Sequence, residues 1–133
     1  MKEEITIKTE ASTPSFSIKA RLRSFRYAFE GLNAFFSTQH NAIIHLIMTI
    51  IVFIAALFFN VSKEEGIALI IVSAIVWMAE LFNTAIEKLA DMVSKDLRPG
   101  IKFIKDVSAA AVLLSATAAF LTGAIIFLPK LMA

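Results

Sequence analysis

The sequence predicts an all-α membrane protein, in which an N-terminal amphipathic surface helix precedes three membrane-spanning helices. Of its 133 residues, 58% are hydrophobic and only 18% are charged, whereas soluble domains are close to half apolar and a quarter charged. A chain this short has too much surface for its volume to bury so many apolar side chains in one core. The charged residues leave long uncharged gaps, and the absence of cysteine excludes disulfides, thiol nucleophiles and cysteine-ligated metals.

The N-terminal part divides into a tail and a helix. Residues 1–15 are polar and without apolar periodicity, which predicts a flexible tail, and residues 16–133 then form one integral-membrane domain. Over about 16–38, apolar residues recur every three or four positions, so they form one stripe of a helix. A basic amphipathic helix just before a span typically lies in the headgroup layer, although the stripe could also pack against other helices. The stripe consists of Ile18, Leu22, Phe25, Phe29, Leu32 and Phe36.

Three stretches are predicted to span the membrane, at about 41–60, 66–90 and 106–128. The first lies in a gap between Glu30 and Lys63 that has no Asp, Glu, Lys or Arg, and residues 107–128 are likewise uncharged. The uncharged part of the second stretch, 66–79, is shorter than the roughly 20 residues that a span needs. The second helix must therefore carry Glu80 within or at the edge of the bilayer.

The basic residues predict the orientation. Three spans place the N-terminus and the second loop on one side, and eleven of the thirteen basic residues fall there. Only Lys63 and Lys130 fall on the other side. By the positive-inside rule, the N-terminus and second loop face the cytoplasm. The eleven residues are Lys2, Lys8, Lys19, Arg21, Arg23, Arg26, Lys88, Lys95, Arg98, Lys102 and Lys105.

Polar residues collect at the predicted cytoplasmic ends of all three spans. A carboxylate near hydrocarbon costs several kcal/mol unless it is paired, hydrated or protonated, so it indicates a functional site. The structural alternative is that Glu80 and Glu87 pair with Lys105 and Lys88 and hold the bundle together. For His45, core packing or an interhelical hydrogen bond is expected. The residues concerned are Gln39, His40, Asn41 and His45 in the first span, Glu80, Asn83, Thr84, Glu87 and Asp91 on one face of the second, and Lys105 and Asp106 in the third.

Paired acids beside a lysine suit Mg²⁺ and the phosphates that it carries, with one carboxylate free to take a proton. The chain has only four glycines and neither a P-loop nor a dinucleotide fingerprint. Spacing alone therefore predicts a membrane site for a cation or a phosphoryl group. A small scaffold or ion-pathway protein stays open, with Glu80 and Glu87 locking an oligomer or lining a pathway. Such a pore would not require the Lys105-Asp106 step.

The same residues resemble the prokaryotic diacylglycerol kinase family, which includes undecaprenol kinases. The resemblance covers about 18–128 and implies a small integral-membrane lipid kinase of the bacterial cytoplasmic (inner) membrane, with its N-terminus and active site on the cytoplasmic side. It further implies a homotrimer with shared active sites, MgATP as phosphate donor and a lipid hydroxyl as acceptor, diacylglycerol being slightly favoured over undecaprenol, and no nucleic-acid partner. The matching segments are ELFNTAIEKLAD from Glu80 to Asp91, KDVSAAAV from Lys105 to Val112, SFRYAFEGL from Ser24 to Leu32 and NAIIHL from Asn41 to Leu46.

The resemblance also assigns roles to individual residues. Glu80 would be the general base that takes the proton of the lipid hydroxyl, with Asn83 helping to position it, and Glu87 would hold the metal. The residues expected to bind ATP are Tyr27, Glu87, Asp91, Asp96, Leu97, Arg98, Lys105 and Asp106. Those expected to contact the lipid are Arg21, Arg23, Glu80 and Ala109.

Two positions depart from the family pattern. Gln39 stands where the family usually has a glutamate that shares the metal with the residue matched by Glu87. An amide oxygen can still bind Mg²⁺, but the site loses a charge and its affinity should fall. Ala20 stands where the family has an arginine, which Arg21 or Arg23 could replace. We expect an active enzyme with weaker metal binding, and the competing hypothesis is a degenerate member without turnover.

Overall fold

The computed structural model describes residues 17–96 and 98–132, so the predicted tail at 1–15 and the predicted ATP ligand Leu97 lie outside the described residues. The described residues form four helices and no strands. The chain divides into two compact units, Met1–Leu32 and Asn33–Ala133. The helices are α1 (Ile18–Thr38), α2 (His40–Phe58), α3 (Lys63–Val93) and α4 (Pro99–Met132).

Helices α2, α3 and α4 are each long and apolar enough to cross a membrane, which agrees with the predicted class of all-α membrane protein. At about 1.5 Å per residue, the 31 residues of α3 and the 34 of α4 extend over about 46 Å and 51 Å. Both lengths exceed the roughly 30 Å of hydrocarbon in a bilayer. The last turns of α3 and the first turns of α4 can therefore carry charged residues beyond the hydrocarbon.

The turn between α2 and α3 is built from short-range signals. Helix α2 ends at Phe58, two residues before the predicted limit, because Asn60 adopts a left-handed backbone with φ of 48°. Ser62 then caps α3: its hydroxyl accepts from the Glu65 N–H, and the Glu65 carboxylate accepts from the Ser62 N–H at 2.7 Å. This capping box satisfies two N–H groups that a helix start leaves without partners.

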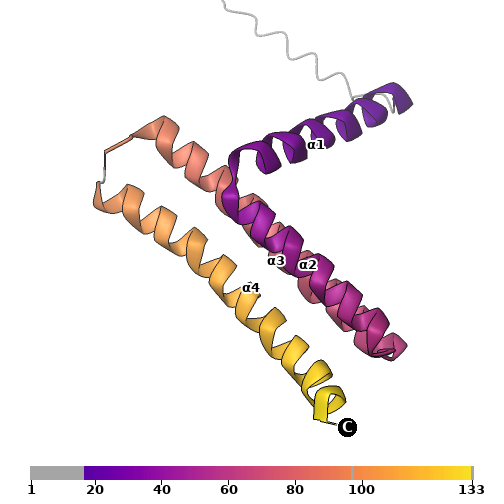
Figure 1. Ribbon diagram of the computed structural model, residues 1–133. Coiled ribbons are helices and arrows are strands. Elements are labelled where there is room, and N and C mark those ends of the chain that lie inside the picture. The colour runs from indigo at the N-terminus through magenta and orange to yellow at the C-terminus, as the bar shows by residue number, and fades with distance from the viewer. Residues whose placement is uncertain (1–16, 97, 133) are drawn as a thin grey trace, which may run out of the picture. The chain divides into compact units, whose positions relative to one another are not determined.

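Within the unit Asn33–Ala133, α3 and α4 lie antiparallel and side by side, and α2 runs along α3 (Figure 1). At the α2–α3 turn, Nζ of Lys130, near the end of α4, lies 3.0 Å from Oε2 of Glu65 at the start of α3. Next to this pair, Ala56, Leu69 and Ile126 form a small buried cluster with one member from each helix. Small side chains such as alanine let membrane helices approach closely, and this cluster fixes the end of the bundle opposite the α3–α4 connection.

Helix α1 extends across the boundary between the two units. Its last turn belongs to the second unit, where Phe35 is buried and the rings of Phe35 and Phe36 lie 6.3 Å and 5.6 Å from the ring of Trp77. Gln39 has an extended backbone and separates α1 from α2. The position of residues 18–32 at the membrane surface stays a prediction.

Candidate active site

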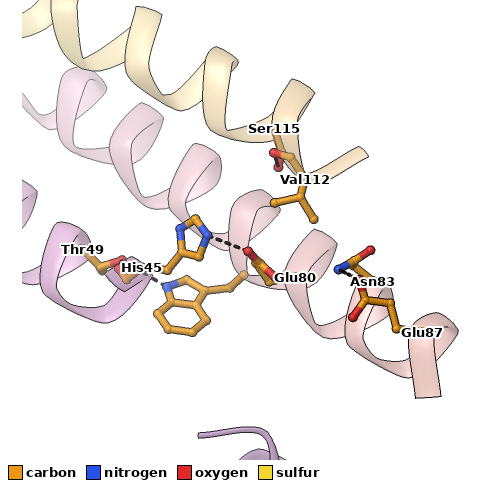
Figure 2. Close-up of polar contacts among 8 residues, drawn as sticks. His45, Thr49, Glu80, Asn83, Glu87, Val112 and Ser115 are labelled. Atoms are coloured by element: carbon orange, nitrogen blue, oxygen red, sulfur yellow. Dashed lines mark hydrogen bonds and ion pairs between the residues drawn. The ribbon is translucent and has the colours of Figure 1, made fainter. Parts of the chain in front are cut away.

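The centre of the site is a buried carboxylate on α3. The side chain of Glu80 lies near the middle of that helix and the residue is only 3% exposed. His45 on α2 approaches it, with Nε2 2.7 Å from Oε1 of Glu80 (Figure 2). We call His45 and Glu80 the inner pair. The interhelical hydrogen bond that the sequence suggested for His45 is confirmed.

His45 is itself held by its neighbours. Its carbonyl oxygen accepts a hydrogen bond from the Thr49 hydroxyl at 2.7 Å, and the same hydroxyl oxygen accepts from the indole N–H of Trp77 at 3.1 Å. The ring of Trp77 also lies edge-on to the imidazole, 6.3 Å between centroids. Trp77 therefore ties α3 to the turn of α2 that carries His45.

A second polar group lies one turn further along α3. Asn83 Nδ2 donates to Oε1 of Glu87 at 3.3 Å, and Asn83 Oδ1 lies 2.7 Å from the hydroxyl of Ser108 on α4. That hydroxyl also lies 2.9 Å from the carbonyl oxygen of Lys105. Ser108 is buried, at 7% exposure, and it was missed as a site residue, although it is three residues from Lys105. Asn83 thus orients Glu87, and its hydrogen bonds go to Glu87 and Ser108, not to Glu80.

The outer part of the site is an ion pair between the two long helices. Lys105 Nζ of α4 contacts a carboxylate oxygen of Asp91 of α3, and both side chains are accessible to solvent, 30% and 47% exposed. We call Asp91 and Lys105 the outer pair. The alternative pairing of Glu80 and Glu87 with lysines is not found among residues 17–96 and 98–132.

Other predicted ATP ligands surround the α3–α4 connection. Asp106 forms an ion pair with Lys102, which lies one turn earlier on α4. Arg98 Nη2 lies 3.7 Å from Asp96 Oδ2, and both side chains are exposed. Ala109, the predicted lipid contact, is exposed on α4 next to the buried Ser108.

Three predicted ligand residues, Arg21, Arg23 and Tyr27, belong to the unit Met1–Leu32. Within that unit, the guanidinium carbon of Arg26 lies 5.5 Å from the ring centroid of Tyr27. Nε of Arg26 also lies 3.4 Å from Oε1 of Glu30. The roles of these residues toward ATP or lipid stay predictions.

The two residues predicted to bind the metal offer oxygen donors. Glu87 offers a carboxylate held by Asn83, and Gln39 offers an amide whose nitrogen donates weakly to the Thr38 hydroxyl at 3.4 Å. In the described part of the chain, no three His, Asp or Glu side chains converge on one point. Mg²⁺ commonly binds one or two carboxylates together with substrate phosphates, not a cage of protein ligands. Glu87 therefore fits a metal that enters with a nucleotide.

An apolar groove lies beside the inner pair. It has a volume of about 500 Å³ and is lined by all three long helices, with His45 and Val76 near one end and Phe127 and Leu128 near the other. Val76 lies one helical turn before Glu80 on α3. The buried carboxylate of Glu80 therefore lies close to a space whose walls are almost entirely apolar.

Comparisons with known proteins identify the family of the chain. The family model of prokaryotic diacylglycerol kinase matches residues 26–127. A diacylglycerol kinase of Synechocystis sp. is 38% identical over 112 residues, which cover 84% of this chain but 64% of that protein, so the match spans less than two thirds of its length. An undecaprenol kinase of Bacillus subtilis is 31% identical over 109 residues, covering 82% of this chain and 89% of that protein. The chain therefore belongs to the prokaryotic diacylglycerol kinase family.

Proposed function

We propose that this protein is an integral-membrane lipid kinase that transfers the γ-phosphoryl group of ATP to the hydroxyl of a membrane lipid, either diacylglycerol or undecaprenol. The observation that carries the proposal is the buried carboxylate of Glu80, which lies between an apolar groove and a charged outer pair. A lipid kinase needs an apolar space for the body of its acceptor and a charged region for its polyanionic donor, with the base between them. Family membership and the names of the two relatives give independent support.

In the proposed reaction, Glu80 takes the proton of the lipid hydroxyl. The hydroxyl oxygen forms a bond to the γ-phosphorus, the bond from this phosphorus to the bridging β–γ oxygen breaks, and ADP leaves. The proton resides on the Glu80 carboxylate until it is released. General-base catalysis of this kind contributes about 10²- to 10⁴-fold to a rate. The remaining requirement of phosphoryl transfer is mostly positioning and neutralisation of charge.

The outer residues supply that neutralisation. Lys105 would leave Asp91 to contact the phosphates, and Asp106, Asp96 and Arg98 would border the nucleotide. Mg²⁺, held by Glu87, would neutralise phosphate charge when bound. Asn83 would keep the Glu87 carboxylate oriented for this purpose. With Gln39 as its neighbour in place of glutamate, the site would bind the metal less tightly.

The same proposal includes the setting of the enzyme. Eleven of thirteen basic residues on the side of the N-terminus and the α3–α4 connection support a multi-pass protein of the bacterial inner membrane with a cytoplasmic active site. Residues 16–38 would form the surface helix, with Arg21, Arg23 and Tyr27 directed to lipid and nucleotide. Many apolar side chains of α2, α3 and α4 are not covered by the chain itself, which suits lipid contact and assembly into a homotrimer.

The decisive experiment measures phosphate transfer from labelled MgATP in mixed detergent–lipid micelles, with diacylglycerol and undecaprenol offered separately. Transfer to one lipid that is lost in Glu80→Gln would establish the activity and identify the acceptor. A folded protein that transfers phosphate to neither lipid, even at high Mg²⁺, would contradict the proposal. That result would favour the degenerate member.

A further inference from the structure

A buried base needs a partner that fixes its position without blocking it. A carboxylate has two oxygens, and a polar group left unpaired away from water costs free energy comparable to a lost hydrogen bond. Among residues 17–96 and 98–132, His45 is the only side chain that hydrogen-bonds Glu80, and it contacts Oε1 alone. The second oxygen, Oε2, has no hydrogen-bond partner among these described residues and is available to accept a proton.

The imidazole is well suited to hold this carboxylate, because its own position is restricted. His45 belongs to α2 and Glu80 to α3, so the bond joins two helices. The Thr49 hydroxyl binds the backbone of His45, and the ring of Trp77 packs against the imidazole. The three rotatable bonds of a glutamate would otherwise allow several positions of the carboxylate.

The direction of the hydrogen bond within the inner pair follows from the proposed role of Glu80. If Glu80 donated the shared proton, it would already be protonated and could not serve as a base. With the Nε2–H of the imidazole as donor, the Glu80 carboxylate accepts the hydrogen bond through Oε1, and Oε2 can take the proton of the lipid hydroxyl. His45 would thus act through Glu80 and not on the reacting atoms themselves.

We propose that His45 is a positioning residue for the catalytic base: its Nε2–H holds Oε1 of Glu80 and directs Oε2 to the lipid hydroxyl at the end of the apolar groove. This inference rests on the proposed kinase function and concerns a residue that the sequence assigned to packing or to a simple interhelical bond. A misplacement of about 1 Å can reduce a rate about 10²-fold, which sets the size of the expected effect.

The test compares His45→Leu, which removes the donor, with His45→Gln, which keeps a neutral N–H donor at similar reach. We expect His45→Leu to lower kcat about 100-fold with the KM values for ATP and lipid little changed. His45→Gln should recover most of that loss. His40→Leu is the matched control: His40 is exposed at the start of α2, so its kcat should stay within about two-fold of the wild type. Helix content and oligomeric size are measured for every variant.

A double variant separates positioning from a structural role. In the Glu80→Gln background, His45→Leu should cause no further loss, because the base through which His45 acts is already absent. An equal fractional loss in both backgrounds, or no recovery with His45→Gln, would overturn the proposal. A wild-type protein that transfers phosphate to neither lipid would instead contradict the kinase function. An active wild type with an equally active His45→Leu variant would contradict the role of His45 alone.

Discussion

The inner pair and the outer pair are both contacts between helices, but they lie in different surroundings. Glu80 and His45 join α3 to α2 where the carboxylate is 3% exposed. Asp91 and Lys105 join α3 to α4 eleven residues further along, about 16 Å away, and both side chains reach solvent. The same face of α3 therefore carries one buried carboxylate and one carboxylate that is accessible to solvent.

This difference suits two tasks of the proposed lipid kinase. A buried pair has few alternative arrangements, since breaking it leaves an uncompensated polar group, so it can hold a base in one position. An exposed ion pair contributes little to stability and is screened by salt. It can therefore exchange one partner for the phosphates of a nucleotide. We expect changes at the inner pair to affect kcat and changes at the outer pair to affect the KM for ATP.

The largest effect should come from Glu80→Gln, which keeps the shape of the side chain and removes the base. We expect kcat to fall about 10²- to 10⁴-fold, while the KM for ATP stays close to that of the wild type because the outer pair is intact. Steady-state transfer to the preferred lipid measures both constants. A large rise in the KM for ATP would show that the two pairs are not separate in function.

Lys105→Met should have the next largest effect, and it should change the KM for ATP more than kcat. Loss of a charged donor to phosphate should raise the KM for ATP about 10- to 100-fold and reduce kcat less. Added salt should weaken ATP binding by the wild type and leave this variant nearly unchanged, because its screened contact is already gone. If the KM is unaltered, Lys105 serves only to join α3 and α4.

Ser108→Ala tests the polar group that lies between the two pairs along α3. It removes the hydroxyl that holds Asn83, so Glu87 should lose its orientation and activity should fall about 2- to 10-fold, with a higher Mg²⁺ requirement. Ser115→Ala is a matched control, because Ser115 is equally buried on α4 but its hydroxyl bonds only to the Val112 carbonyl oxygen at 2.8 Å (Figure 2). Equal activities of the two variants would contradict the assigned role of Ser108.

Gln39→Glu should increase the affinity of the site for Mg²⁺, and this effect should be smaller than those above. A second carboxylate would restore a charge toward the metal, so the Mg²⁺ concentration for half-maximal activity should fall a few-fold. Calorimetric titration of Mg²⁺ in the presence of a non-hydrolysable ATP analogue gives a readout that does not depend on turnover. An unchanged affinity together with unchanged activity would exclude Gln39 from the metal site.

The smallest effect on activity is expected at the other end of the bundle. Ser62→Ala removes the N-cap of α3 and should reduce stability by about 1 kcal/mol, measured by denaturant titration in detergent. Neither kcat nor the KM for ATP should change, because the cap lies at the opposite end of α3 from both Asp91 and the α3–α4 connection. A clear loss of kcat would mean that the two ends of α3 are coupled.

The sequence by itself determined the membrane class, the number of apolar helices and the candidate residues. Apolar runs predict spans because backbone groups in hydrocarbon must be satisfied within the helix, and this is a property of each segment alone. Likewise, intervals of three, four, seven and eleven residues placed Asn83, Thr84, Glu87 and Asp91 on the face of Glu80. The acidic motif was specific enough to indicate the family.

Only the tertiary structure decided which residues are partners. Periodicity defines the face of one helix, but the rotation and axial shift of its neighbours depend on packing among many small side chains. Lys105 and Lys88 seemed natural partners for Glu80 and Glu87 by charge. Instead, Glu80 bonds to His45, Glu87 bonds to Asn83, and Lys105 bonds to Asp91. The partner of a buried carboxylate is the polar side chain of the adjacent helix that lies at the same depth. The packing of the helices fixes that depth.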